Sequence, residues 1–190
     1  MRAQVSSSSS TTRSWRFSDR VVTDDRDPFE RLENTHRRIE ERLDTLERAA
    51  SELDGVERMR ALRDVYDVVR FFARAAVRHH DDEEASLFPR LARVTELAPL
   101  LASLEAEHRA HDAAYTELAA LVDAFPSDVG PERADEVRLA ALARRLSEIY
   151  RAHIAREERE LFPAARRALD AAACSAMADE MQARRGQGRA

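Results

Sequence analysis

The sequence predicts an all-α protein, and three observations lead to that class. Only four glycines occur in 190 residues, which leaves too little turn chemistry for a sheet of many strands. Apolar residues recur at steps of three and four along four long segments, which is the period of an amphipathic helix. Because short loops join these segments, we expect an up-down-up-down four-helix bundle.

The first helix is predicted to follow a polar leader. Residues 1–27 hold a Ser/Thr run and then a stretch rich in Arg and Asp without apolar periodicity, so we expect a disordered segment there. The pattern changes at Asp27-Pro28, where Asp27 suits an N-cap and Pro28 suits a first helical turn. The first helix should therefore run from about 28 to 52 and stop near Gly55.

Three more helices are expected from their apolar stripes. The second should end around Leu87-Phe88-Pro89 and the fourth at Leu161-Phe162-Pro163, because proline cannot continue the hydrogen-bond ladder. Between them, the third stripe runs from Leu101 to Val122. The bundle would then span 28–163, and 164–190 would form a short C-terminal helix and a tail. The candidate packing residues of that last segment are Leu169, Met177 and Met181.

Composition excludes several classes of function. The 31 basic residues, all arginine, are scattered among 36 acidic ones for a net charge of −5, which does not favour a nucleic-acid partner. No stretch approaches the roughly 20 apolar residues of a membrane span. The single Cys174 excludes an intramolecular disulfide framework, a multi-cysteine zinc site and a CxxC redox pair. We expect a cytoplasmic protein in which Cys174 is a packing residue.

An internal repeat joins the ends of the second and fourth helices. Residues 79–89 and 153–163 both read H-x-x-x-E-E-x-x-L-F-P, at a constant offset of 74. A histidine also precedes each copy on the helix before it, since His36 lies 43 residues ahead of His79 and His108 lies 45 ahead of His153. The chain therefore reads as two helical hairpins of similar construction.

The spacing within the repeat points to metal chemistry. A His and a Glu four residues apart share one helix face, about 6 Å apart along the axis, and the helix lengths allow all four histidines to fall in one layer. A lone histidine on an apolar face is usually a hydrogen-bonded core residue. Four at one level with two inward carboxylates would be costly polar intrusions, unless a cation compensates them. Imidazole and carboxylate donors suit iron or manganese.

On these residues the sequence resembles the hemerythrin-like proteins with an HHE cation-binding domain, over about residues 28–163. The resemblance implies a four-helix bundle with a non-haem di-iron centre that is oxo- or hydroxo-bridged, with manganese or zinc as substitutes. Glu83 and Glu157 would bridge the two ions. The implied ligands are His36, His79, Glu83, His108, His153 and Glu157.

The sequence departs from the oxygen-carrying members of that family. Those typically show HxxxH on the third helix and HxxxxD on the fourth, whereas the third helix here has His111 three residues after His108 and the fourth has HxxxE. His111 is therefore a candidate ligand, a neighbour of a ligand, or a core residue. The other candidates for alternative ligands or supporting groups are Glu40, Asp112, Tyr115 and Tyr150. His80, Glu84 and Glu158 lie about 100° round the helix from the ligands and are predicted to be on the surface.

Two functions at this centre and one without metal stay open. The first is a di-iron protein that binds or senses oxygen, nitric oxide or iron itself. The alternative is a di-iron redox enzyme that acts on peroxide, nitric oxide or Fe(II). The third is a metal-free interaction bundle. The expected partner in the first two is a small diatomic ligand or peroxide, and the sequence leaves open whether there is catalytic turnover.

Overall fold

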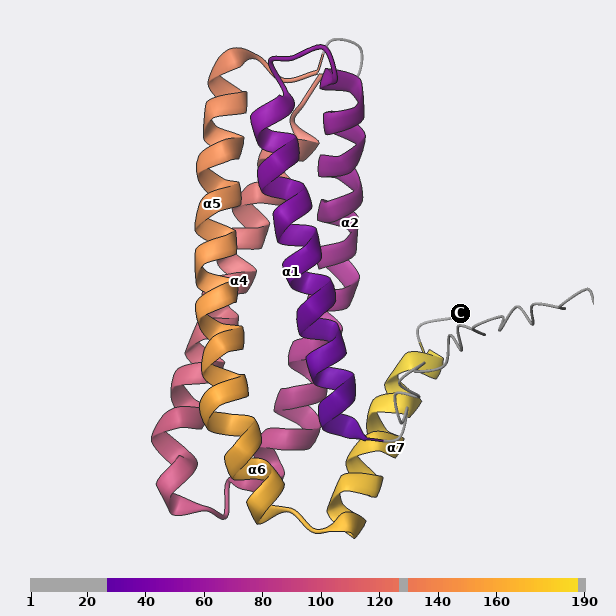
Figure 1. The fold of residues 1–190 in the computed structure, drawn as a ribbon, viewed down its shortest axis with the longest axis vertical. Coiled ribbons are helices and arrows are strands. Elements are labelled where there is room, and N and C mark those ends of the chain that lie inside the picture. Colours follow the sequence, from indigo (N-terminus) through magenta and orange to yellow (C-terminus); the bar gives the residue numbers. More distant parts are fainter. Residues whose placement is uncertain (1–26, 127–129, 188–190) are drawn as a thin grey trace, which may run out of the picture.

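The computed structural model describes residues 27–126 and 130–187, and every regular element in this part of the chain is helical. Four long helices lie alongside one another: α1 (Pro28–Glu52), α2 (Arg58–Asp82), α4 (Ala98–Asp123) and α5 (Arg133–Arg156) (Figure 1). Helices α1 and α4 each contact both α2 and α5, so the four surround one interior. The predicted all-α class is confirmed, whereas the expected disorder of the leader concerns residues that, apart from Asp27, lie outside the described ranges.

Helix α1 begins and ends where the sequence predicts. The Asp27 carboxylate accepts a hydrogen bond from the backbone N–H of Phe29 at 2.8 Å, and Pro28 occupies the first turn. Such a cap satisfies one of the N–H groups that the first helical turn leaves without a partner. None of the helices in the described residues is both long and apolar enough to cross a membrane.

Both helices that carry the repeat continue past their prolines, so the prediction that they end at Pro89 and Pro163 is wrong. Helix α2 passes into a π-helical turn, η1 (Glu83–Leu87), and then into α3 (Phe88–Leu91). Helix α5 likewise passes into η3 (Glu157–Leu161) and α6 (Phe162–Ala168). The wider turn places each proline in the first turn of the following α-helix, where a missing N–H breaks no bond. After α3, a 3-10 turn, η2 (Thr95–Leu97), leads into α4.

Two apolar clusters fill the interior, one on each side of a polar layer. On α1, Ile39 belongs to the larger cluster and Leu32 to the smaller one, and His36 lies between them in sequence. On α5 and η3, Tyr150 belongs to the larger cluster and Leu161 to the smaller one, and His153 and Glu157 lie between them in sequence. The polar layer is therefore closed by packed side chains on both sides.

The C-terminal segment forms two helices, which corrects the single short helix expected from Ala164 to Arg185. Helix α6 stops at Ala168, Leu169 is extended, and Asp170 caps the start of α7 (Ala171–Gln187) by accepting from the N–H of Ala173 at 2.8 Å. Met177 and Met181 are fully buried, which confirms them as packing residues.

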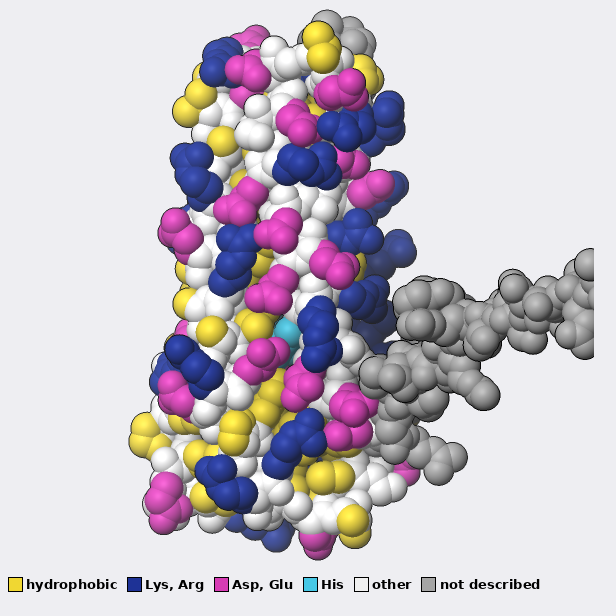
Figure 2. Space-filling view, viewed as in Figure 1, with side chains coloured by type: hydrophobic (Ala, Val, Ile, Leu, Met, Phe, Trp, Pro, Cys, Tyr) yellow, Lys and Arg dark blue, Asp and Glu magenta, His cyan; other side chains and the backbone are white. Residues whose placement is uncertain are grey.

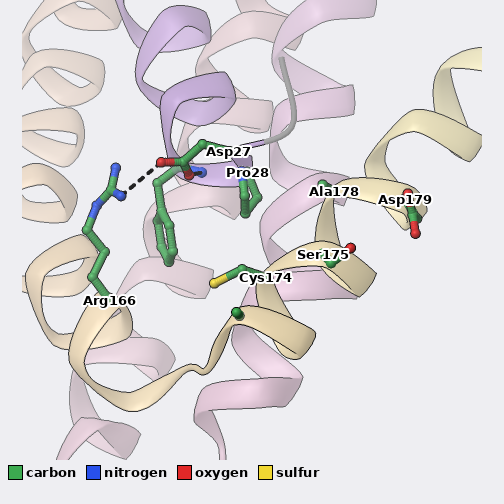
Figure 3. A pocket seen from close by; sticks show the side chains of 9 residues that line it. Asp27, Pro28, Arg166, Cys174, Ser175, Ala178 and Asp179 are labelled. Carbon is green, nitrogen blue, oxygen red and sulfur yellow. Dashed lines mark hydrogen bonds and ion pairs between the residues drawn. The ribbon is translucent and has the colours of Figure 1, made fainter. Parts of the chain in front are cut away.

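Helix α7 lies against the start of α1 (Figure 3). Cys174 is partly buried there and packs against the smaller apolar cluster, as a packing residue should. Beside it, Arg166 of α6 donates to the Asp27 carboxylate at 3.0 Å. The end of the repeat, the start of the bundle and the C-terminal helix thus form one packed unit.

A buried carboxylate ties α7 to the repeat on α2. Asp82 accepts hydrogen bonds from Arg184 at 2.8 Å and from Arg185 at 2.9 Å. One turn earlier on α7, Glu180 accepts from Ser86 at 2.6 Å and from Arg90 at 2.6 Å. The π-helical turn η1 is therefore held from outside the four-helix bundle.

Candidate metal centre

Four buried imidazoles meet in one layer, as the helix lengths predict. The Nε2 atoms of His36 on α1 and His79 on α2 lie 3.0 Å apart. The Nε2 atoms of His108 on α4 and His153 on α5 lie 3.1 Å apart. All four side chains are at most 3% exposed, so each pair presents its inner nitrogens to the interior of the bundle.

Two carboxylates connect the histidine pairs. Glu83 places Oε1 3.5 Å from Nε2 of His79 and Oε2 3.3 Å from Nε2 of His108. Glu157 places Oε2 3.2 Å from Nε2 of His36 and Oε1 3.3 Å from Nε2 of His153. Each carboxylate therefore offers one oxygen to each pair.

These six residues form two groups that can each hold a metal ion, and the groups share both carboxylates. Within a group, the candidate ligand atoms all lie within 4.8 Å of one another. The first group is His36, His79, Glu83 and Glu157, and the second is Glu83, His108, His153 and Glu157. This is the arrangement that two neighbouring cations bridged by two carboxylates require.

The π-helical turns begin at the bridging residues. Glu83 is the first residue of η1 and Glu157 the first of η3, each one α-helical turn after its histidine. Their own N–H groups still bond to the carbonyls of the preceding α-helix, whereas the N–H of Phe88 reaches back five residues to the Glu83 carbonyl. Single π turns inside α-helices are frequent at functional sites.

The donor set fits a cation because its buried oxygens are otherwise unsatisfied. Within the described part of the chain, none of the four carboxylate oxygens of Glu83 and Glu157 makes a hydrogen bond of adequate geometry. Both residues are fully buried, where an unpaired charge is strongly unfavourable. Nitrogen and carboxylate donors in this number suit a divalent transition metal and not a softer thiolate-bound ion.

The surroundings shift the pKa values of the two carboxyls in opposite directions. Burial and the nearby Glu157 carboxylate raise the pKa of Glu83 well above its usual range. Although burial opposes it, contacts with His153 and His36 hold the pKa of Glu157 well below its usual range. Burial and the charge of His36 lower the pKa of His79 well below that of a free imidazole. A bound cation would favour the charged form of both carboxyls.

Two carboxylates of the repeat hold outer nitrogens of the histidines. His36 Nδ1 lies 2.9 Å from Glu158 Oε1, and His108 Nδ1 lies 2.7 Å from Glu84 Oε1. The side chains of Glu158 and Glu84 are 44% and 46% exposed, as predicted for the surface, yet each reaches in to a candidate ligand. A carboxylate at Nδ1 fixes the N–H there and leaves Nε2 free to bind metal.

A third carboxylate with this role, Glu107, was missed from the sequence. Its Oε2 lies 2.8 Å from Nδ1 of His153, and its other oxygen accepts from Arg156. Arg156 also donates to Ser103 at 2.6 Å, which fixes the direction of the guanidinium. The only signal in the sequence was the position of Glu107 directly before His108.

Two further histidines and a tyrosine pack against the second pair. His80 is only 6% exposed and stacks on His108 with ring centroids 3.9 Å apart, so its predicted surface position is wrong. His111 stacks on Tyr150 at 4.0 Å and meets His153 edge-on at 4.7 Å. Burial lowers the pKa of His80 to about 2 and that of His111 to about 3, so both stay neutral. The three rings lie beside the candidate ligands and in neither group of four.

The remaining sequence candidates lie away from the centre. Glu40 is half-buried and belongs to neither group of the described residues. The Asp112 side chain is 63% exposed and lies 3.6 Å from Nδ1 of His80. The Tyr115 hydroxyl donates to the Val69 carbonyl at 3.2 Å, which ties α4 to α2.

The fold, the repeat and the paired donors define a helical protein of the cation-binding kind. The hemerythrin HHE cation-binding domain matches residues 27–165, and the chain belongs to this family. The chain is also 33% identical over 129 residues to an uncharacterized protein of Haemophilus influenzae (strain ATCC 51907 / DSM 11121 / KW20 / Rd), covering 65% of this chain and 69% of that protein. No solved structure gives a significant match.

Proposed function

We propose that this chain binds two iron ions at the His/Glu centre of an up-down-up-down bundle and uses them to bind or sense oxygen, nitric oxide or iron itself. The observation that carries the proposal is the sharing of Glu83 and Glu157 between two histidine pairs. A single ion would need only one pair. Two pairs linked by both carboxylates provide four protein donors for each of two ions.

The residues around the centre prepare it for a small ligand. A di-iron pair supplies a redox couple and coordination positions beyond the four protein donors. Glu84, Glu107 and Glu158 orient three of the imidazoles through their outer nitrogens. The apolar clusters on both sides of the layer exclude water, so a small uncharged diatomic molecule is the ligand that this interior suits best.

Anaerobic reconstitution with Fe(II), followed by exposure to air, tests the proposal. We expect about two irons per chain by metal analysis and the near-ultraviolet absorption of an oxygen-bridged ferric pair. Parallel loading with Mn(II) and Zn(II) ranks the metals. A protein that stays colourless and takes up none of these metals would contradict the proposal and favour a metal-free interaction bundle.

A redox enzyme at the same centre is the second candidate, and Tyr150 is the observation that favours it. Its phenol is 2% exposed and stacks on His111, which in turn contacts His153. Burial raises the pKa of Tyr150, so the phenol keeps its proton near the centre and can donate an electron together with it. Steady-state consumption of peroxide, nitric oxide or Fe(II) that falls in Tyr150→Phe would support turnover. A stoichiometric reaction unaffected by that change would support binding or sensing.

A further inference from the structure

A hollow rich in arginine lies next to the first histidine pair. It is bounded by α1, α2 and the end of α7 and has a volume of about 680 Å³. Five of the described residues that line it are arginines and none is acidic; the arginines are Arg38, Arg70, Arg74, Arg78 and Arg185. Three of them recur every four residues on α2, so they project from one helix face. On the face in Figure 2, dark blue side chains gather along the edge near α2, whereas they alternate with magenta ones elsewhere.

Most of this positive charge is not neutralised by the described residues. Arg70 pairs with Asp67, and Arg185 with Asp82. Arg74 and Arg78 have no ion pair or hydrogen bond with any described residue, and Arg38 only lies over the ring of Phe71 at 5.6 Å. In a chain of net charge −5, so many uncompensated guanidiniums around one hollow form a local field that attracts anions.

One arginine of the hollow, Arg78, contributes to the lowered pKa of Arg185. Burial lowers it, and the charges of Arg31 and Arg78 lower it further, although Asp82 acts in the opposite direction. An anion in the hollow would relieve this repulsion between like charges.

The candidate ligand His79 also lines the hollow and carries a buried donor without a partner. His79 is only 3% exposed, and its Nδ1 is inaccessible to solvent. This nitrogen makes no hydrogen bond with any described residue. Nε2 of the same ring faces His36 and Glu83, so the hydrogen-bonding direction of Nδ1 points away from these two side chains. The other three histidines of the layer each have a carboxylate at that nitrogen. A buried imidazole N–H without an acceptor is strongly unfavourable.

The internal repeat shows which group is missing. In the second hairpin the partner of His153 is Glu107, the residue before His108. The corresponding residue before His36 is Thr35, which lines the hollow and whose hydroxyl donates to the Arg31 carbonyl at 3.0 Å. The first hairpin therefore has a short neutral side chain where the second has a carboxylate. The α5 counterparts of Arg74 and Arg78, at the offset of 74, are Glu148 and Ala152, so these two arginines belong to the first hairpin alone.

We propose that this hollow binds a small oxyanion with at least two negative charges, such as a phosphate or a polycarboxylate. One oxygen of the anion accepts a hydrogen bond from the Nδ1–H of His79. The guanidiniums of Arg38, Arg74 and Arg78 donate to the other oxygens. Arginine suits this role because its planar fork can donate two parallel hydrogen bonds to a carboxylate or phosphate. The anion takes the place that Glu107 fills in the second hairpin. Its binding would therefore change the hydrogen bonding of His79, a candidate metal ligand.

Calorimetric titration of the full chain with inorganic phosphate and, separately, with citrate tests the proposal. We expect one site per chain and binding at least tenfold weaker in Arg74→Gln/Arg78→Gln. The control Arg144→Gln/Arg145→Gln removes the same charge from α5, outside the hollow, and should bind as the unchanged protein does. Binding by phosphate alone, by citrate alone or by both supports the site and identifies the source of the oxyanion. No binding of either at millimolar concentration, or equal weakening in both double variants, overturns it.

A second variant gives a test that keeps every arginine. Thr35→Glu installs the carboxylate of the second hairpin, and we expect it to abolish phosphate and citrate binding. Thr45→Glu is its matched control, since the Thr45 hydroxyl also donates to the carbonyl four residues earlier, at 2.8 Å. Unchanged anion binding in Thr35→Glu overturns the proposal. Each titration is run with metal-free and iron-loaded protein, so a failure to bind iron is read separately from a failure to bind the anion.

Discussion

The two halves of the candidate metal centre have the same inner face and different surroundings. The Nε2 atoms of His36 and His79 are 3.0 Å apart, and those of His108 and His153 are 3.1 Å apart. Each half receives one oxygen from Glu83 and one from Glu157. The internal repeat has therefore duplicated the ligand geometry closely.

Outside the ligands the halves differ. In the second half both histidines have a carboxylate at Nδ1, and His80 and His111 pack around them. In the first half His36 has such a partner, whereas His79 borders the hollow lined by arginines. The comparison teaches that the repeat keeps the inner donors alike while the groups around them differ. We expect the second half to be the more rigid and the first to be the one that responds to solutes.

Removal of a shared carboxylate should weaken metal binding in both halves, because each half depends on it. Glu157→Ala takes one oxygen from each group of four. We expect the iron content after reconstitution to fall from about two per chain to less than about one, because each ion loses one of its four protein donors. Circular dichroism should still show a helical protein. Glu160→Ala, in the same π-helical turn, is the control, and a Glu157→Ala protein with both irons would contradict the shared role.

Acid should destabilise the second half of the metal-free protein through His111. Burial lowers the pKa of His111 to about 3, whereas an unfolded histidine titrates near 6.5. Above pH 6.5 the group is neutral in both states; as the pH falls below 6.5 the unfolded state binds a proton and the folded state does not, so stability decreases. At pH 4 this contribution reaches up to about 3 kcal/mol.

His111→Phe should therefore flatten the loss of unfolding free energy between pH 7 and pH 4, measured by urea denaturation of the metal-free protein. Phenylalanine preserves a ring of similar size against Tyr150. Asp112→Asn, on the exposed neighbouring residue, serves as the control. A variant with the same pH dependence as the unchanged chain would show that His111 does not carry the effect.

The sequence predicts which side chains meet in the two groups better than it predicts their surroundings, for a physical reason. His79, Glu83, His153 and Glu157 follow from helical geometry within one segment, and His36 and His108 from the lengths of two hairpins. Glu107 on α4 contacts His153 on α5, and no local pattern in the sequence marks a contact between two helices. His80 lies one residue from a ligand, but the α2–α4 contact buries that flank of the helix as well.

The π-helical turns could not be predicted from local composition either. Pro89 and Pro163 indicate helix ends when only the α-helical ladder is considered. In the folded chain the tertiary packing of Leu87, Phe88 and their counterparts in the smaller apolar cluster keeps the helix continuous, and the wider turn accommodates the proline. The preference is set by contacts distant in sequence.

Loss of Glu107 should make the second half resemble the first. Glu107→Gln leaves an amide near Nδ1 of His153 and removes the ion pair with Arg156. We expect the metal affinity of the second half to fall about 10–100-fold, since such partners orient an imidazole and raise its basicity. Competition with a chelator of known affinity measures the change. Glu105→Gln, exposed on the same helix, should leave the affinity unchanged, and an equal loss in both variants would point to net charge as the cause.

The reverse change should make the first half resemble the second, with the smallest effect. Thr35→Glu adds a carboxylate on the side of His79 where the repeat places Glu107 in the other hairpin. We expect metal affinity to rise by less than about tenfold, because nearby arginines compete for the new carboxylate and part of its charge stays hydrated. The same chelator competition measures it, with Thr45→Glu as the control. The metal affinity could stay unchanged in Thr35→Glu while Glu107→Gln weakens the other half. In that case metal binding by His79 does not need a fixed internal partner at Nδ1, and the two halves differ in this requirement.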